Sequence, residues 1–274
     1  MTTTPRVAGL LALLVAAGCS TGHNYPDASG PRYAGPHPVL PPPTPLEDDT
    51  LRVVSFNIEH AARVDSALRV LAETPELRDP DIVLLQEMDE AATRRIAGAL
   101  RMGYVFYPAS YRSGTGRDFG NAVLSRWPIE DDDKVVLPHR SVFNRSLRTA
   151  TGATLRIRGR LVRVYSLHLA TVVNQWPWHR DDQLRAVLDD AEGYPLVIVG
   201  GDMNSGGMGK MAVERGYGWP TRDGPDTVGF WRWDHIFVRG LTAPDAAAAG
   251  TVLDNRGASD HRPVWIRVVL PPES

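Results

Sequence analysis

The stretch from Pro195 to Asn204, with the sequence PLVIVGGDMN, decides the fold of this chain. Its apolar part, Leu196 to Val199, is bounded by a proline and a pair of glycines, which is typical of a strand buried on both faces of a sheet. Asp202 and Asn204 follow two residues apart, so in an extended segment their side chains point to one side, at the mouth of the sheet. A carboxylate beside an amide can accept a proton, orient a water molecule or ligate a metal. The same residues also suit an ordinary Gly-Asp turn, and the rest of the chain has to distinguish the two interpretations.

Polar residues also stand at the ends of the other predicted strands. Apolar runs predict strands at 51–58, 81–86, 105–109, 120–126, 154–157, 161–169, 233–238 and 264–269, and helical spacing predicts helices at 63–71, 91–100 and 180–191. The polar residues beside these runs are Asn57, Glu87, Asn121, His168, Asp202, Asn204, Asp234, Asp260 and His261. Each alone has an ordinary explanation as a cap, turn or core residue. Their recurrence favours one shared site at the rim of a sheet, where α/β folds bind ligands.

The residue types in this set point to metal and phosphate chemistry. Aspartate and glutamate are hard oxygen ligands for Mg²⁺ or Mn²⁺. A histidine paired with an aspartate suits acid–base work, since the carboxylate fixes the tautomer of the imidazole. The sequence contains no HExxH motif, no cysteine cluster and no Walker loop.

Residues 1–19 are expected to lie outside the fold. Arg6 precedes a short apolar run, Val7 to Ala17, that is too short to span a bilayer comfortably and ends at Cys19. This resembles a bacterial lipoprotein signal, whose cysteine becomes the lipidated first residue. We therefore expect export and a membrane anchor on Cys19, in the periplasm or at the cell surface. Cys19 is the only cysteine, so the domain must hold together without a disulfide within the chain.

Residues 20–50 are predicted to be a proline-rich tether, and residues 51–270 a single α/β domain. The tether segment holds prolines at 26, 31, 36, 38, 41–43 and 45 and shows no helical or strand periodicity, which favours an extended spacer. The domain is long enough to bury a sizeable core. The formal net charge of the chain is −2. Because proteins dedicated to nucleic-acid binding usually carry a basic excess, this charge argues against such a role.

Seven short motifs in the domain resemble, in their order, those of the endonuclease/exonuclease/phosphatase superfamily. They are SFNI, LLQEM, GNAVLSR, SLHL, GGDMN, WDHIFV and SDHRPV, and they cover the chain from Leu51 to about Leu270. The superfamily includes deoxyribonuclease I-like nucleases, apurinic/apyrimidinic endonucleases, inositol polyphosphate 5-phosphatases and bacterial sphingomyelinases. The resemblance implies a four-layer α/β sandwich, with two packed, mostly antiparallel sheets, outer helices and an active site along one rim.

The resemblance also implies a role for each matching residue. It implies that Glu87 binds the metal, Mg²⁺ or Mn²⁺, with Asn57 and Asp260 close by. Asp202 would activate the attacking water, Asn204 would orient it, Asp234 would orient His261 at the scissile phosphate, and His168 would contact a phosphate oxygen. Asn121 and Arg148 would bind substrate, whereas Arg180 and Gln183 would be structural. The glycine pair before Asp202 would let the backbone approach the substrate closely.

Three functions remain open from the sequence. The first is a metal-dependent phosphodiesterase or phosphatase outside the cytoplasm that acts on a small or lipid-derived phosphate. The second is an extracytoplasmic endonuclease that degrades DNA, and the third is a catalytically silent binding module. Aromatic residues at Tyr217, Trp219, Phe230 and Trp231, and also Trp176 and Trp178, could stack on a base, touch lipid or belong to the core. Nothing in the sequence indicates a protein partner.

Overall fold

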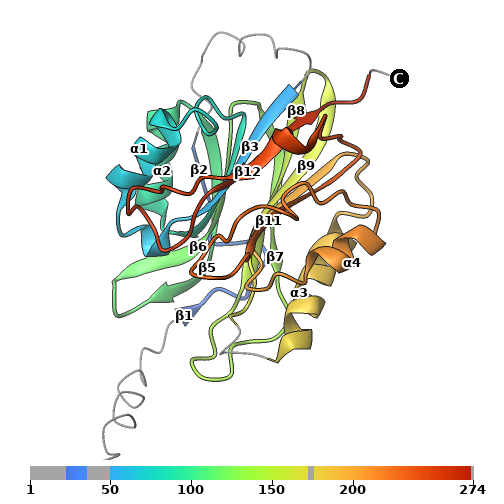
Figure 1. Cartoon of the computed structure of the whole chain (residues 1–274). Helices are drawn as coiled ribbons and strands as arrows, with labels where there is room; N and C mark the ends of the chain where they lie inside the picture. Colours follow the sequence, from blue (N-terminus) through green and yellow to red (C-terminus); the bar gives the residue numbers. More distant parts are fainter. Residues whose placement is uncertain (1–22, 36–49, 172–175, 273–274) are drawn as a thin grey trace, which may run out of the picture.

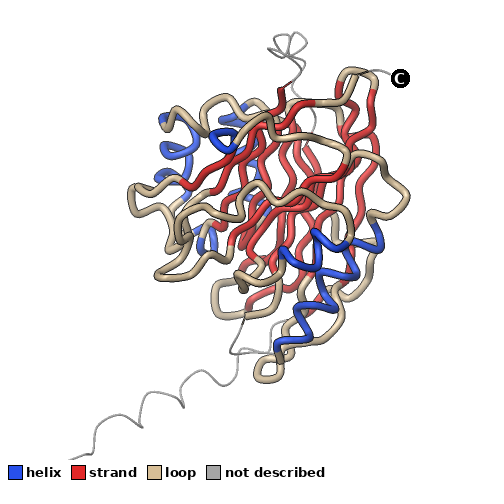
Figure 2. The backbone as a smooth tube through the Cα atoms, turned by 45° about the vertical axis from the view of Figure 1, so that its right-hand side comes forward, coloured by secondary structure: helices blue, strands red, loops and turns tan. Residues whose placement is uncertain are grey.

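The computed structural model describes residues 23–35, 50–171 and 176–272, which form two β-sheets packed face to face (Figure 1). From a second side, the strands make up the middle of the molecule and the helices flank them (Figure 2). This is the four-layer α/β sandwich implied by the resemblance, so the predicted fold class is confirmed.

The first sheet has eight strands in the order β1-β5-β6-β4-β3-β13-β12, with β2 also paired to β5. They are β1 (His23–Asn24), β2 (Tyr33–Gly35), β3 (Thr50–Asn57), β4 (Ile82–Met88), β5 (Gly103–Arg112), β6 (Arg117–Ser125), β12 (Ala249–Thr251) and β13 (Val264–Val269). Strands β3 and β4 are parallel. Helices α1 (Val64–Glu73) and α2 (Glu90–Leu100) bury their apolar faces against this sheet. A short 3₁₀ helix, Glu59–Ala61, follows β3.

The second sheet has five strands in the order β11-β10-β9-β8-β7. They are β7 (Ile129–Val136), β8 (Thr149–Ile157), β9 (Arg160–His168), β10 (Val197–Asp202) and β11 (Asp234–Arg239). Strands β9 and β10 are parallel, and the other pairs are antiparallel. Helices α3 (Pro177–Asp190) and α4 (Gly209–Glu214) pack on its outer side, and a 3₁₀ helix, Ala246–Ala248, precedes β12.

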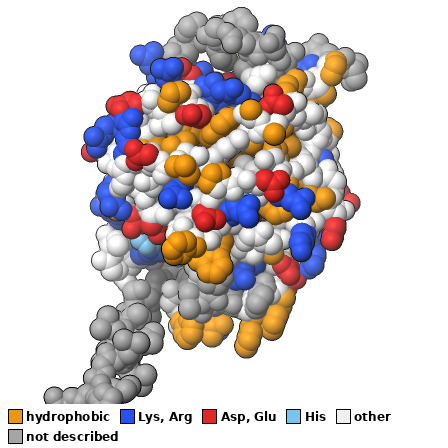
Figure 3. Space-filling view, in the orientation of Figure 1, with side chains coloured by type: hydrophobic (Ala, Val, Ile, Leu, Met, Phe, Trp, Pro, Cys, Tyr) orange, Lys and Arg blue, Asp and Glu red, His pale blue; other side chains and the backbone are white. Residues whose placement is uncertain are grey.

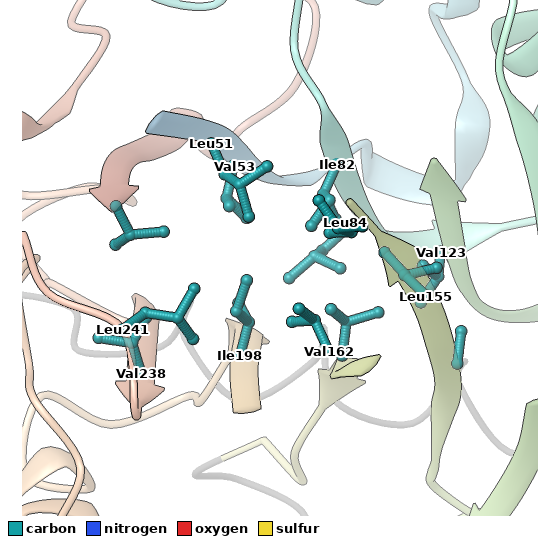
Figure 4. Close-up of a cluster of buried hydrophobic side chains, with 14 of the residues drawn as sticks. Leu51, Val53, Ile82, Leu84, Val123, Leu155, Val162, Ile198, Val238 and Leu241 are labelled. Atoms are coloured by element: carbon teal, nitrogen blue, oxygen red, sulfur yellow. The ribbon is translucent and has the colours of Figure 1, made fainter. Parts of the chain in front are cut away.

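The core between the two sheets is built from the inward residues of both. Leu51, Val53 and Leu84 of the first sheet face Val162 and Ile198 of the second (Figure 4). All five side chains are fully buried. Because side chains alternate along a strand, the outward residues of the same strands pack beneath the helices. This double burial explains why the runs around β3, β4 and β10 are apolar at nearly every position.

Gly201 in β10 is required by the packing of the strands themselves. Its φ angle is +152°, and a Cβ atom there would lie 1.8 Å from the carbonyl oxygen of Leu167 in β9. The structure therefore corrects the expectation that this glycine serves close approach to a substrate, because the close neighbour is backbone of the adjacent strand.

The prediction that residues 20–50 form an extended tether is wrong for residues 23–35. These residues pair with β5 through β1 and β2. The Arg32 Nε lies 2.5 Å from Asp132 Oδ1, and the Tyr25 hydroxyl donates to Asp118 Oδ1 at 3.0 Å. Proline content excludes a helix here but does not prevent side chains between the prolines from packing. We call residues 23–35 the N-terminal strap.

The predicted signal segment and residues 36–49 lie outside the described residues. Among the described helices, none is long and apolar enough to cross a membrane.

Candidate active site

The predicted polar residues meet at one rim because the register of the strands brings them together. Asp202, at the end of β10, is paired with His168 of β9 on one side and with Asp234 of β11 on the other. Asn57 ends β3 in the facing sheet, and its Nδ2 donates to Asp202 Oδ2 at 3.1 Å and to Glu87 Oε1 at 3.4 Å. The site therefore lies where the two sheets meet.

His261 lies between two carboxylates. Its Nδ1 is 2.8 Å from Asp234 Oδ2, and its Nε2 is 3.7 Å from Asp202 Oδ2. The same Asp202 oxygen is 3.3 Å from His168 Nε2. The His261 backbone N–H donates to Ser259 Oγ, which fixes the loop before β13. All five side chains belong to buried residues, so the charges in this group act in an environment that strengthens their interaction.

The protonation states of His261 and Asp202 follow from the same contacts. Burial would lower the pKa of His261, but the charge of Asp234 and the hydrogen bond to it raise that pKa to about 10. Burial and the charge of Asp234 also raise the pKa of the Asp202 carboxyl, against the opposing effect of His261. At neutral pH His261 is therefore an imidazolium. Asp202 binds a proton more readily than an ordinary aspartate, which suits a general base.

Glu87 lies at an irregularity in β4. The pairing register shifts between Leu85 and Met88, and Glu87 has a φ angle of 61°, which is uncommon for a residue other than glycine. Such a bulge takes a side chain out of the regular alternation of the strand. The Glu87 Oε2 atom accepts from the His60 backbone N–H at 3.1 Å and lies 2.6 Å from His60 Nδ1.

The Glu87 carboxylate is ionised. Burial would raise its pKa, but the hydrogen bond from His60 and the nearby charge of Arg148 hold the pKa well below its usual range. An ionised carboxylate at the edge of a cavity is available as a hard oxygen ligand.

A group of cationic and aromatic side chains surrounds Phe119 in β6. The guanidinium carbon of Arg112 lies 3.5 Å from the Phe119 ring centroid, and that of Arg148 lies 5.5 Å away. The His168 ring is 6.1 Å from the same centroid. The buried Nη1 of Arg148 has no hydrogen-bond partner among the residues that the structure describes. An unpaired buried donor costs free energy that a bound anion would recover.

Arg112, Phe119 and Arg148 line a cavity of about 410 Å³. Its wall combines Arg112, Arg148 and Glu87 with amide and hydroxyl groups, including Asn144 and Ser146. Arginine matches the oxygen geometry of phosphate, and hydroxyl and amide groups add further donors. The cavity therefore suits a phosphate group placed beside the two arginines and Glu87.

Three further predicted residues make contacts with the protein at or near the site, and their predicted roles stay predictions. Asn121 donates from its Nδ2 to the Thr149 carbonyl at 2.6 Å, a bond that links the two sheets. Asn204 donates its backbone N–H to Asp202 Oδ1 at 2.8 Å and thereby orients the Asp202 carboxylate. Asp260 is exposed and accepts from Ser259 Oγ at 3.3 Å.

The remaining predicted positions are structural. Gln183 accepts from the backbone N–H of Ala170 and donates to the Pro138 carbonyl at 2.8 Å, so it ties α3 to the loops after β7 and β9. Arg180 is buried, as a structural role implies.

Sequence reasoning missed His60, Arg112 and Phe119. His60 lies in the 3₁₀ helix after β3 with a φ angle of 59°, and its motif, Ile58-Glu59-His60, directly follows the strand. That position after a strand was the available signal. Arg112 and Phe119 lie on the β5–β6 hairpin, in a glycine- and charge-rich stretch without any strand-end pattern.

The donor set fits a divalent metal in two overlapping places. Asp202, Asp234 and His261 offer ligand atoms that all lie within 4.8 Å of one another. Because a protonated His261 has no free lone pair, the oxygens of Asp202 and Asp234 are the donors that this cluster offers at neutral pH. One oxygen of Asp234, Oδ1, is buried without a partner among the described residues. Glu87 offers a second carboxylate, while Asn57 turns its amide nitrogen, as assigned, towards the carboxylates. Hard oxygen donors thus lie on both sides of Asn57.

This fold and this set of residues define a class of phosphoester-hydrolysing proteins. The chain matches the Endonuclease/Exonuclease/phosphatase family over residues 54–261 and belongs to that family. Its members are phosphoesterases and nucleases, which suggests a metal-dependent phosphoester hydrolase.

Solved structures share the fold. An endonuclease/exonuclease/phosphatase from Beutenbergia cavernae is 22% identical, with 81% of this chain and 72% of that chain covered and a TM-score of 0.64. A humanized D. rerio TDP2 is 20% identical, with 80% and 99% covered and a TM-score of 0.64. The human Nocturnin catalytic domain, with bound sulfate, is 18% identical, with 82% and 96% covered and a TM-score of 0.60. No curated protein matches this chain.

Proposed function

We propose that this protein is a metal-dependent hydrolase of phosphoester bonds that acts outside the cytoplasm. The observation that carries the proposal is the buried, unpartnered Nη1 of Arg148. It belongs to the wall of the cavity that Glu87 also lines, and the charges of both Glu87 and Asp202 act on this guanidinium. A cation held in this way, whose charge interacts with that of Asp202, suits the oxygens of a phosphate ester.

In this proposal Asp202 removes a proton from the attacking water. Its Oδ1 is held by the Asn204 backbone N–H, and its Oδ2 faces His168 and His261. The imidazolium of His261, kept charged by Asp234, stabilises negative charge on the phosphate oxygens. His168 stays neutral because burial and the nearby charge of Arg148 lower its pKa well below the ordinary value. Its imidazole can therefore donate one hydrogen bond without adding charge.

Glu87 is the residue that we propose to hold the metal, Mg²⁺ or Mn²⁺, with Asp260 and Asn57 as the further candidates from the sequence. The ion supplies positive charge to the phosphate and to the leaving oxygen when it is bound. The cluster of Asp202, Asp234 and His261 is the other place where ligand atoms converge.

The location rests on the lipoprotein-like signal. We propose that the chain is exported and anchored through a lipid on Cys19. Mass spectrometry of the mature N-terminus tests this directly, since a lipidated Cys19 as first residue is expected and an intact residue 1–19 segment would contradict it.

Hydrolysis of bis-p-nitrophenyl phosphate, with Mg²⁺ and with EDTA, tests the activity. We expect turnover with Mg²⁺, loss of turnover with EDTA, and a loss of about 10³-fold in kcat for Asp202→Asn or His261→Ala. Leu161→Glu is a control, because Leu161 is exposed at the opposite end of β9 from His168. Turnover by Asp202→Asn at the wild-type rate would sink the proposal.

A nuclease is the second candidate, favoured by the exposed turn that the bridge between Val228 and Trp231 closes. Phe230 is 91% exposed and Trp231 is 59% exposed, and the turn residue Val228 forms a β-bridge with His261. Exposed aromatic side chains beside a phosphate site can stack on bases. A structure of D. rerio TDP2 in complex with single-stranded DNA product shares the fold, at 19% identity. Hydrolysis of plasmid DNA, with no turnover of lipid or small phosphate esters, would favour this candidate.

A further inference from the structure

Four exposed apolar side chains stand near the cavity of the candidate site. Val142 and Phe143, in the loop between β7 and β8, are 55% and 76% exposed, and Trp176 and Trp178, at the start of α3, are 59% and 54% exposed. Hydrophobic side chains gather at the lower end of the molecule (Figure 3), where Figure 1 places this loop and α3. Large apolar side chains that cluster on a surface mark an interaction site. We call these four residues the apolar rim.

Contacts between the loop and the helix make the apolar rim one surface. The rings of His139 and His179 stack with centroids 3.8 Å apart, and His139 Nε2 lies 2.8 Å from Asp182 Oδ2. The rings of Trp176 and Trp178 stack at 5.2 Å. The loop and the helix that carry the two pairs of apolar residues are therefore in contact.

The loop half of the apolar rim borders the cavity. Asn144 directly follows Phe143 and lines the cavity, as does Ser146 in the same loop. Thr171, which follows β9, lines it as well. Whatever covers the apolar rim therefore lies beside the opening through which substrate reaches Arg148.

The charges of the loop between β7 and β8 are positive, whereas α3 brings Asp182 to the helix half of the apolar rim, where it pairs with His139 and Arg185. The sequence has no aspartate or glutamate between Asp133 and Asp181, and the loop that carries Phe143 holds Arg140 and Arg145, both exposed. Exposed aromatic residues flanked by arginines suit the interface of an anionic phospholipid bilayer, where the rings sit among head groups and the arginines face lipid phosphates.

The N-terminal strap ties the chain to this same face. Asn24 Nδ2 donates to the Arg145 carbonyl at 2.9 Å, and Asn24 Oδ1 accepts from the Leu147 N–H at 2.9 Å. Cys19 precedes His23 by four residues, which span at most about 14 Å when fully extended. A lipid on Cys19 would therefore hold this face of the domain close to the bilayer.

We propose that the apolar rim docks on the surface of the phospholipid bilayer that carries the Cys19 anchor, so that the cavity opens towards the lipid head groups. The proposal rests on the anchored hydrolase proposed above. Two independent features support this orientation: the short link from Cys19 to β1, and the apolar and basic character of the loop between β7 and β8.

Vesicle co-sedimentation tests the docking without the lipid anchor. A chain that begins at Ser20 keeps every element that the structure describes, and we expect it to bind vesicles of phosphatidylethanolamine and phosphatidylglycerol. Phe143→Glu and Trp178→Glu should each weaken binding at least tenfold. Leu161→Glu, which places the same charge at an exposed apolar position at the far end of β9, should bind like wild type.

Hydrolysis of soluble bis-p-nitrophenyl phosphate separates the two proposals. Phe143→Glu and Trp178→Glu should hydrolyse this ester like the wild type. If the wild-type chain itself shows no hydrolysis, the proposed hydrolase is contradicted, and the vesicle binding still tests the docking separately. Equal vesicle binding by wild type and both variants, or no binding by the wild type, would overturn the docking. A change in oligomeric state without a change in vesicle binding would overturn it too, because the rim would then be a contact between copies of the chain.

Discussion

Arg148 carries a charge that the described residues pair incompletely. Burial lowers its pKa, the charges of Glu87 and Asp202 oppose this, and Nη1 has no hydrogen-bond partner. Keeping such a group costs stability and is typical of a residue retained for binding. The function and the stability of the protein should therefore respond in opposite directions when Arg148 is replaced.

Arg148→Ala should lower kcat/KM about 100-fold, which corresponds to about 3 kcal/mol, and leave the melting temperature unchanged or raised. Arg148→Lys keeps the charge without the planar fork and should recover part of the activity. Steady-state kinetics on a soluble phosphate ester and thermal unfolding of the same samples check both readouts. A variant that loses stability and keeps its kinetics would show that Arg148 is a structural cation.

The burial of His235 leads to a second prediction, which concerns how the free energy of unfolding depends on pH. His235 accepts from Trp219 Nε1 at its Nδ1 and lies 3.1 Å from the Arg232 carbonyl at its Nε2, which fits the neutral ring. Burial lowers its pKa to about 4. Because the unfolded chain binds this proton near pH 6.5 and the folded chain does not, the stability is complete above that pH and falls as the pH drops towards 4.

The fall attributable to His235 should amount to about 3 kcal/mol between pH 7 and pH 4. His235→Gln retains a donor and an acceptor but does not titrate, so its unfolding free energy should depend less on pH. Urea unfolding of both proteins at several pH values measures the difference. Parallel pH profiles would show that the ring is protonated in the folded state.

Residues at strand ends could be predicted from the sequence, and others could not. Asp202, Asp234 and His168 follow apolar runs, and strand register then places them side by side. Phe119 reaches the site from within strand β6. In the sequence, a phenylalanine at such a position looks the same as a core residue. Arg112 lies at the end of β5, and its place at the site can be recognised only when the β5–β6 hairpin is known. The position of Asn121 was predicted, but its hydrogen bond across the sheets depends on how the sheets pack.

Strand β10 shows how one backbone position can constrain an element. Gly201 combines a φ angle of +152° with a neighbouring carbonyl oxygen that a Cβ atom would approach to 1.8 Å. No side chain fits without moving β9 away from β10. Gly193, in the turn before β10, has open space instead.

Gly201→Ala should destabilise the protein by roughly 3 kcal/mol or more, since strain and a backbone clash add. Gly193→Ala should change the unfolding free energy by less than about 1 kcal/mol. Urea unfolding curves of the two variants and wild type provide the comparison. A Gly201→Ala protein as stable as Gly193→Ala would mean that β9 and β10 can separate at low cost.

The strands that the sequence did not predict lie at the edges of the sheets. Strand β7 has the sequence IEDDDKVV, whose consecutive charges hide the strand pattern, and it is the edge strand of the second sheet. Charged residues are common on edge strands because they discourage pairing with other chains. The β1 and β2 strands are too short to show periodicity. Hydrophobic patterning therefore predicts the central strands but not the short or charged strands at the edges.

The whole molecule joins a core that needs no N-terminal segment to a strap that crosses one side of it. The sandwich core is formed by residues from Leu51 onwards. The strap adds strand pairing to β5, the Arg32–Asp132 ion pair, and a lysine, Lys134, whose Nζ donates to the Tyr25 carbonyl at 3.2 Å. It also supplies Asn24 to the wall of the cavity. The strap should thus matter more for the site than for folding.

A chain that begins at Pro36 should fold but melt roughly 5–10 °C below one that begins at Ser20, the shift expected for a loss of about 2–3 kcal/mol in a domain of this size. Its KM for a soluble phosphate ester should rise, because Asn24 no longer holds the loop that contains Asn144 and Ser146. The Ser20 chain with Asn24→Ala separates the two effects, since it keeps the β2 pairing and the ion pair and loses only the contacts to that loop. If the Pro36 chain matches the Ser20 chain in both melting temperature and KM, the strap is a passive spacer after all.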